Sequence, residues 1–273
     1  MGRFNKHIKS LLLILYLVSI ACDSLAPMPD PTNPYDPNNP HYEPAKAIIL
    51  DGPADGDTLR VSTATFRWTG NAIAGEYCYQ FDHGDWLEWS IDSVVTFTYL
   101  NEENYRFRIV ARADDQVQTM GDTVSVSFTV NAVRGPALMV YPRYTEISAG
   151  EECEIEIRAE EVDSLMGVEV EVIFDPAIIR IKDIIYGNFL FKDSNTSISF
   201  QEVDNTTGRI SAVLVRVNES NPCVSGTGTL AIFKIEALSV GTTDIEINTS
   251  VYKDQNNDLI DVTQRGNGII VVE

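Results

Sequence analysis

The chain has 273 residues, of which 44% are hydrophobic, and its 20 Lys and Arg against 40 Asp and Glu give a formal net charge of −20 at pH 7. So acidic a chain repels phosphate backbones, which excludes nucleic acid as a partner and a basic membrane-binding surface. The hydrophobic content and the length predict one or two globular domains, and only three histidines are present for metal or acid–base chemistry.

Residues 1–21 have the organisation of a secretory signal peptide. A short basic head precedes an apolar run over residues 11–21, which is too short to cross a membrane as a helix. The run ends in the sequence Ser19–Cys22, which resembles the lipidation site of bacterial lipoproteins. The resemblance implies a secreted protein that is anchored to a membrane by acyl chains on Cys22, on the cell surface or the periplasmic face. Ordinary secretion with an incidental cysteine is the alternative.

Residues 22–44 are predicted to form a tether. The segment from residue 23 to 44 contains seven of the twelve prolines of the chain, which exclude a helix or a central strand. At about 3.1 Å per residue an extended segment of this length spans up to roughly 60–70 Å. A proline-rich ligand for another domain is the alternative interpretation.

Residues 45–132 contain short alternating segments separated by turn sequences, which predict a small β-sandwich. One predicted hairpin joins residues 77–81 to residues 86–89. The domain resembles a fibronectin type III or related immunoglobulin-like module. The resemblance rests on Pro53 in the opening turn, Trp68 on an early strand, and the spacing of Leu100 and Tyr105, which is similar to a tyrosine corner. It implies a spacer or a binding platform.

Trp86 and Trp89 have two interpretations in this domain. Aromatic rings stack on sugars, so the pair is a candidate carbohydrate-binding platform. Alternatively, at least one of them belongs to the core, because a sandwich of this size needs large apolar side chains. Residues three apart on one strand point to opposite faces, so the two rings share a platform only if the strand bends.

Residues 136–273 show about nine alternating segments and no helical period, which predicts a two-sheet, jelly-roll-like sandwich. The expected architecture of the whole chain is therefore all-β, with two β-sandwich domains after a signal peptide and a proline-rich tether. Within the second domain, residues 165–176 alternate, most clearly where valine and glutamate take turns over residues 168–172, and end in a turn. A second alternating segment follows over residues 208–217.

The order of motifs in this second domain resembles a cohesin domain. The resemblance covers about half of the chain and rests on these segments: Val140–Pro142 with Gly150, Met166–Gly167, Phe174–Pro176, Gly187–Leu190, Gly208–Ile210, Gly226–Ala231, and Leu259–Val262 with Gly268–Val271. It implies a non-catalytic module that captures a dockerin-type protein, as cohesins do when they assemble polysaccharide-degrading enzymes. Direct binding of polysaccharide is the alternative function.

The candidate partner-binding residues lie on two strands of the second domain. In the resembled family one sheet face contacts the dockerin, and polar residues of the third strand take part. The alternation predicts that Gly167, Glu169, Glu171 and Ile173 point outward on one strand, and Arg209, Ser211, Val213 and Val215 on the other. An apolar strip with a charged rim is typical of a protein contact. A further element that covers this face is the alternative.

No catalytic residues, metal site or cofactor are predicted. The second domain has no histidine, which excludes Ser-His-Asp and Cys-His arrangements there. The segment Asp254–Asp258 begins like a calcium loop but lacks the glycine and the distal glutamate, so we expect a hairpin turn. Cys153 and Cys223 are compatible with a disulfide in an oxidising compartment, and the sequence leaves that pairing open.

Overall fold

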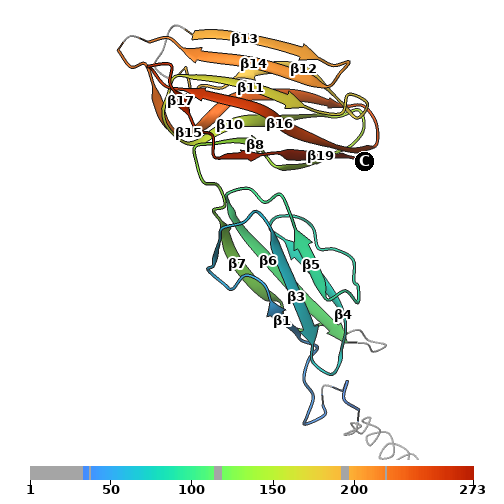
Figure 1. Ribbon diagram of the computed structural model, residues 1–273. Coiled ribbons are helices and arrows are strands. Elements are labelled where there is room, and N and C mark those ends of the chain that lie inside the picture. The colour runs from blue at the N-terminus through green and yellow to red at the C-terminus, as the bar shows by residue number, and fades with distance from the viewer. Residues whose placement is uncertain (1–32, 37, 114–118, 192–196, 219) are drawn as a thin grey trace, which may run out of the picture.

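The computed structural model describes residues 33–36, 38–113, 119–191, 197–218 and 220–273 (Figure 1). Within these ranges the chain forms strands β1 to β19 and no helix, which confirms the all-β class predicted from the alternation. Accordingly, the described part of the chain contains no helix that is long and apolar enough to cross a membrane. The signal peptide, Cys22 and most of the tether lie outside the described residues.

The first sandwich consists of one three-stranded and one four-stranded sheet. The first sheet has the order β1 (Ala47–Asp51), β3 (Ala64–Gly70), β5 (Val94–Phe97), and the second has the order β2 (Thr58–Leu59), β7 (Val124–Val130), β6 (Asn104–Ala113), β4 (Ala74–Phe81). Aromatic rings fill the space between the sheets. Phe66 of β3 stacks on Phe107 of β6 with ring centroids 4.1 Å apart, and Trp68 packs beside them. This core is independent of the second sandwich.

Tyr105 forms the hydrogen bonds of a tyrosine corner at the start of β6. Its hydroxyl accepts a hydrogen bond from the Asn101 backbone N–H at 2.8 Å and donates one to the Asn101 carbonyl at 3.3 Å. Leu100 is buried next to this turn. The arrangement predicted from the Leu100–Tyr105 spacing is therefore present, and it fixes the backbone of residues 101–103.

The second sandwich has a five-stranded and a seven-stranded sheet. The five-stranded sheet has the order β12 (Ile179–Tyr186), β15 (Val224–Ala237), β10 (Glu152–Leu165), β8 (Ala137–Tyr141), β18 (Gln264–Gly266). The seven-stranded sheet has the order β13 (Ser197–Asp204), β14 (Arg209–Arg216), β11 (Gly167–Ile173), β16 (Gly241–Lys253), β19 (Gly268–Val272), β9 (Tyr144–Ile147), with β17 (Leu259–Ile260) paired to β16. Aliphatic residues of both sheets form one continuous core between them.

Some local expectations for the second sandwich were wrong. The described residues form twelve strands in this domain, because the short edge strands β9, β17 and β18 follow no clear alternation. Residues 188–190, for which the sequence predicts a short strand, form a bend and turn, since Gly187 and Phe189 donate to the Leu230 and Thr229 carbonyls of β15. Cys153 and Cys223 are free thiols in the structure and form no disulfide with each other.

The two sandwiches meet at the segment that the tyrosine corner fixes. The Asn101 side-chain oxygen accepts a hydrogen bond from the Arg143 backbone N–H at 2.9 Å, and Glu102 accepts one from the Val133 N–H at 2.6 Å. Tyr141 donates its hydroxyl to Glu103, which raises the pKa of Tyr141 to about 12, with burial as a second cause. The chain enters the first sandwich at the end opposite the second one (Figure 1).

Replacement of the corner hydroxyl tests its role. We expect Tyr105→Phe to lower the free energy of unfolding of the first sandwich by about 1–3 kcal/mol, because the Asn101 amide loses a buried partner. Urea denaturation followed by tryptophan fluorescence measures the change, since all three tryptophans are in this sandwich. Tyr79→Phe is the control, because it removes the same atom from another ring of this core. Equal losses in both variants would contradict the assignment.

Candidate partner-binding face

The central strands of the seven-stranded sheet alternate between core and surface. On β11 the side chains of Val168, Val170 and Val172 are at most 4% exposed, and on β14 Ile210 and Leu214 are equally buried. Their neighbours along each strand therefore point away from the core. We call the outward side of strands β13, β14, β11 and β16 the outer face.

An apolar strip crosses one half of the outer face. Phe200 of β13 is opposite Val213 of β14, Val213 is opposite Glu169 of β11, and Glu169 is opposite Val251 of β16. Phe200 is 56% exposed, Val213 and Val251 are half-buried, and Glu169 is exposed. With Val215, which is also half-buried, these side chains place apolar surface on three strands, β13, β14 and β16, around the Glu169 carboxylate on β11. We call Phe200, Val213, Val215 and Val251 the apolar strip.

A hollow of about 210 Å³ adjoins this strip. Its walls include Glu169, Val213, Val215 and Val251. The floor is open because Gly167 lies between Val215 on β14 and Lys253 on β16 and has no side chain. The sequence predicted Gly167 as an outward, exposed position. It occupies the outward register but is itself buried, since the larger side chains on both neighbouring strands cover its backbone.

The other half of the outer face is polar. Glu171 accepts hydrogen bonds from the Asn248 amide and the Arg209 guanidinium, and these two donors hold the pKa of its carboxyl below the ordinary glutamate value. Ser211 is half-buried beside Glu171, and Ile173 is half-buried between Arg209 and Glu246. A charged, hydrogen-bonded border thus lies next to the apolar strip.

All seven predicted partner-binding residues therefore lie on one continuous surface. They are Glu169, Glu171, Ile173, Arg209, Ser211, Val213 and Val215. The structure adds Phe200 and Val251, which the sequence analysis did not name. The outward position of Phe200 could have been predicted from the alternation of its own strand. The outward position of Val251 could not, because the β11–β16 pairing shifts register after Glu171. This irregularity changes which residues of β16 point outward.

The opposite face of the sandwich is different. The outward side chains of β12, β15 and β10 form ion pairs between Arg180 and Glu236, between Lys182 and Glu152 at 2.5 Å, and between Lys234 and Glu154 at 3.7 Å. Charges of alternating sign across strands are typical of a solvated sheet surface, and each exposed pair adds little stability. Ion pairs therefore occupy most of this face, around one apolar pair, Ile185 and Ile232. The seven-stranded sheet instead exposes the apolar strip.

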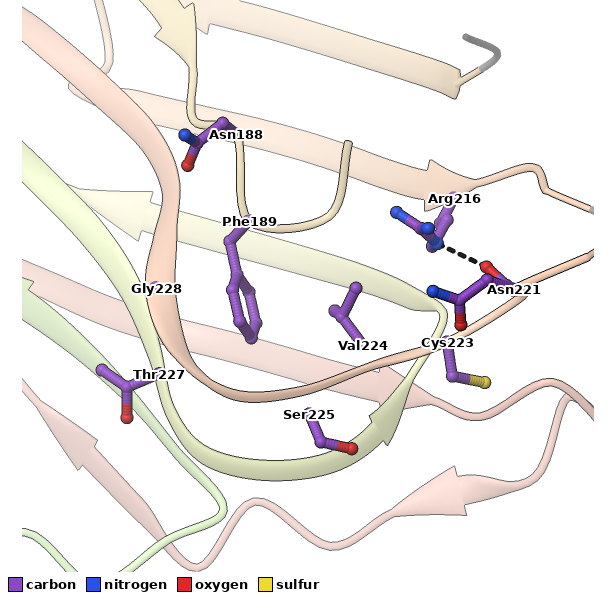
Figure 2. Close-up of a pocket in the computed structure, with 9 residues that line it drawn as sticks. All are labelled: Asn188, Phe189, Arg216, Asn221, Cys223, Val224, Ser225, Thr227 and Gly228. Carbon is purple, nitrogen blue, oxygen red and sulfur yellow. Dashed lines mark hydrogen bonds between the residues drawn. The ribbon is translucent and has the colours of Figure 1, made fainter. Parts of the chain in front are cut away.

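A larger hollow, of about 680 Å³, lies at one end of the second sandwich (Figure 2). The fully buried Arg216 lies in its wall and donates to the carbonyls of Leu190 and Asn221, both at 2.7 Å. Figure 2 shows the Phe189 and Val224 side chains between the strands that surround it. Because the guanidinium binds backbone oxygens of two loops, we assign it a structural role at the end of the sandwich.

The tryptophan pair of the first sandwich departs from the core interpretation. Residues 86–89 form no strand, and neither Trp86 nor Trp89 belongs to the core. The segment pairs with β4 through backbone hydrogen bonds from Leu87 to the Tyr79 carbonyl and between Tyr77 and Ser90, as the predicted hairpin requires. On the outward side of β4, Cys78 donates its thiol to the Leu87 carbonyl. Both rings therefore lie on the same side of the sheet, each against an arginine of β6. The expectation of opposite faces was wrong because it assumed a regular strand.

The described part of the chain contains no group of His, Cys, Asp and Glu side chains that could hold a metal ion. In the segment that begins like a calcium loop, the Asp254 carboxylate accepts the backbone N–H groups of Asn256 and Asp258, at 2.8 and 2.9 Å. That carboxylate caps the turn between β16 and β17.

No protein-family model matches the chain, and no curated protein matches it. Solved structures do. A non-cellulosomal cohesin from the archaeon Archaeoglobus fulgidus is 15% identical, covers 50% of this chain and 90% of its own, and has a TM-score of 0.42. A type II cohesin domain from the cellulosome of Acetivibrio cellulolyticus is 19% identical, with 49% and 94% covered and a TM-score of 0.44.

A third structure is the sixth cohesin of scaffoldin B from Acetivibrio cellulolyticus, in complex with a mutant Cel5 dockerin. It is 14% identical, covers 51% of this chain and 100% of its own, and has a TM-score of 0.44. The chain is thus similar to cohesin domains over about half of its length.

The effect of the Arg209 hydrogen bond on the pKa of Glu171 can be tested. We expect Arg209→Ala to raise the pKa of Glu171 toward the ordinary glutamate value, measured by NMR titration of the side-chain carboxyl. A lowered pKa in the folded state stabilises the protein above the ordinary glutamate pKa, and this stabilisation is lost as the pH falls through the lowered value. Arg180→Ala is the matched control, because it removes the equivalent partner of Glu236 on the opposite face. A Glu171 pKa that is the same with and without Arg209 would contradict the assignment.

Proposed function

We propose that this chain is a non-catalytic binding protein whose second sandwich captures a protein partner on the outer face. The contrast between the two sheets is the observation that supports this most directly. Ion pairs surround a single apolar pair on the five-stranded sheet, Ile185 and Ile232, whereas the seven-stranded sheet exposes Phe200 beside three half-buried valines. Apolar surface that spans several neighbouring strands and is accompanied by charges is characteristic of a protein interface.

The partner class in this proposal is a dockerin-type module. It follows from the cohesin-like motifs of residues 136–273, and it places the protein in the assembly of polysaccharide-degrading enzymes. The remaining segments fit the same proposal. A lipid on Cys22 holds the chain on a membrane, residues 22–44 act as a tether, and the first sandwich acts as an immunoglobulin-like spacer. The interdomain hydrogen bonds of residues 101–103 keep the two sandwiches in a defined orientation.

A pull-down tests the partner class. Purified residues 45–273 are expected to capture a dockerin-bearing protein from the secreted fraction of the source organism in the presence of calcium. Capture should be lost with a chelator, because dockerins are folded by calcium. Insoluble polysaccharides are tested in parallel. Retention on polysaccharide without any protein partner would replace this proposal with the alternative, carbohydrate binding at the cell surface.

Substitutions at the strip test the face. We expect Val213→Asp to weaken partner binding by roughly tenfold or more, about 1.4 kcal/mol, because it places a second carboxylate next to Glu169 and removes apolar contact. The double variant with Glu169→Ala should abolish capture. Ile232→Asp is the matched control, since Ile232 is half-buried at the equivalent surface of β15. Calorimetric titration measures both, and equal losses in the two single variants would contradict the assignment.

A substitution at Gly167 tests whether the hollow belongs to the interface, and it removes none of the side chains that are already there. A Cβ at this position would meet Val215 Cγ2 at 3.5 Å and the Leu214 carbonyl at 3.6 Å, which are ordinary contacts. We therefore expect Gly167→Val to leave the melting temperature unchanged or higher, while it fills the hollow and lowers partner affinity at least severalfold. Thr242→Val, at the far end of β16, should bind like the parent. Unchanged affinity in the Gly167 variant would exclude the hollow from the interface.

A further inference from the structure

The first sandwich has a basic surface that is unusual for a chain of net charge −20. Arg106, Arg108 and Arg112 share one strand, β6. Arg106 is exposed and the other two are half-buried, whereas Phe107, Ile109 and Ala111 between them are fully buried in the core. The alternation thus places three guanidinium groups in one row on the outward side of the four-stranded sheet.

The tryptophans hold two of these arginines. The guanidinium carbon of Arg108 lies 5.6 Å from the centroid of the Trp86 ring, and that of Arg112 lies 4.5 Å from the centroid of the Trp89 ring. Arg112 also forms an ion pair with Glu76, and Trp89 is half-buried, so this end of the row is occupied within the protein. Trp86 is 40% exposed, which leaves its ring available beside Arg108.

A hollow of about 320 Å³ opens at the other end of the row. Arg106, Arg108, Asn104 and Ser127 line it from strands β6 and β7, and Asp82 and His83 line it from the turn after β4. His83 is bound to Asp82 at 2.7 Å. The Nε atom of Arg108 is buried and has no hydrogen-bond partner within the described residues. The hollow therefore combines two cationic groups, a donor without a partner, and several polar side chains.

These groups fit one kind of ligand. Arginine forks bind carboxylates with paired hydrogen bonds, and a guanidinium that is already stacked on an indole loses less conformational freedom on binding. An exposed indole face packs against a sugar ring, and Asp82, Asn104 and Ser127 offer acceptors and donors for hydroxyl groups. The Asp82 carboxylate disfavours polymers of very high charge density, and an acidic peptide has no hydroxyl-rich ring for the indole.

We propose that the outward side of β6, at Arg106, Arg108 and Trp86, binds an acidic sugar chain, with a uronate carboxylate on the two arginines and a sugar ring against Trp86. This site is separate from the outer face of the second sandwich and does not depend on it. One chain then binds a protein partner with one domain and a carboxylated glycan with the other.

Calorimetric titration of the full chain with oligogalacturonate of about six units tests the proposal, with the fully methyl-esterified oligomer and an oligoglutamate peptide of equal charge as reference probes. We expect binding of the free acid and at least tenfold weaker binding of both reference probes. Arg106→Gln combined with Arg108→Gln should lower affinity for the free acid tenfold or more, and Trp86→Ala severalfold. Arg180→Gln, an exposed arginine of the second sandwich, is the matched control.

The outcomes separate the alternatives. Thermal unfolding of each variant shows whether it is folded. If the double arginine variant does not fold, the affinity of Trp86→Ala is the test, because this substitution changes a partly exposed ring. Absence of binding to oligogalacturonate at millimolar concentration would overturn the proposal. Equal affinity for oligoglutamate would replace the sugar by an acidic peptide, and equal losses in the Arg180 control would show unspecific charge attraction.

Discussion

The period of two along a β-strand is the constraint on which this structure depends. Each strand of the second sandwich that supplies the core with one set of side chains must also present the other set to the surface. On β10 and β15 that second set is mostly charged and forms ion pairs across the strands. On β14 it includes Val213 and Val215, which no ion pair covers. The difference between the two sheets is therefore a property of the outward set alone, since the inward sets are equally apolar.

The same alternation organises the first sandwich, where the outward set of β6 is basic and not apolar. Its inward set makes the aromatic core around Phe66 and Phe107, and its first buried residue, Tyr105, fixes the segment that contacts the second sandwich. Strand β6 thus carries the arginine row, contributes to the core, and begins next to the segment that forms the domain junction. The junction lies at one end of this sandwich, and the chain enters the sandwich at the other end (Figure 1).

Much of the fold and of the partner-binding face could be predicted from the sequence wherever the alternation is regular. The phase of β11 follows from the alternation of valine with glutamate, and that of β14 from Arg209, Ile210 and Ser211 at its start, which the apolar residues after them continue. Val251 could not be assigned, because an irregularity in β16 reverses the phase and leaves no local signal. The position of Trp86 and Trp89 could not be predicted either. Their segment does pair with β4 through Leu87 and Ser90, as the predicted hairpin requires, but it forms no regular strand. Its side chains therefore do not alternate, and both rings pack on arginines of β6.

Carboxyl footprinting of the captured complex tests the central claim most directly, because exposed glutamates lie on both faces of the second sandwich. Glu169 and Glu202 are on the outer face, and Glu152 and Glu154 are on the opposite one. Carbodiimide labelling, read by mass spectrometry with and without the partner, compares them within one molecule. The account predicts that bound partner protects Glu169 and Glu202 and leaves Glu152 and Glu154 labelled as before. Protection of the second pair alone would contradict it.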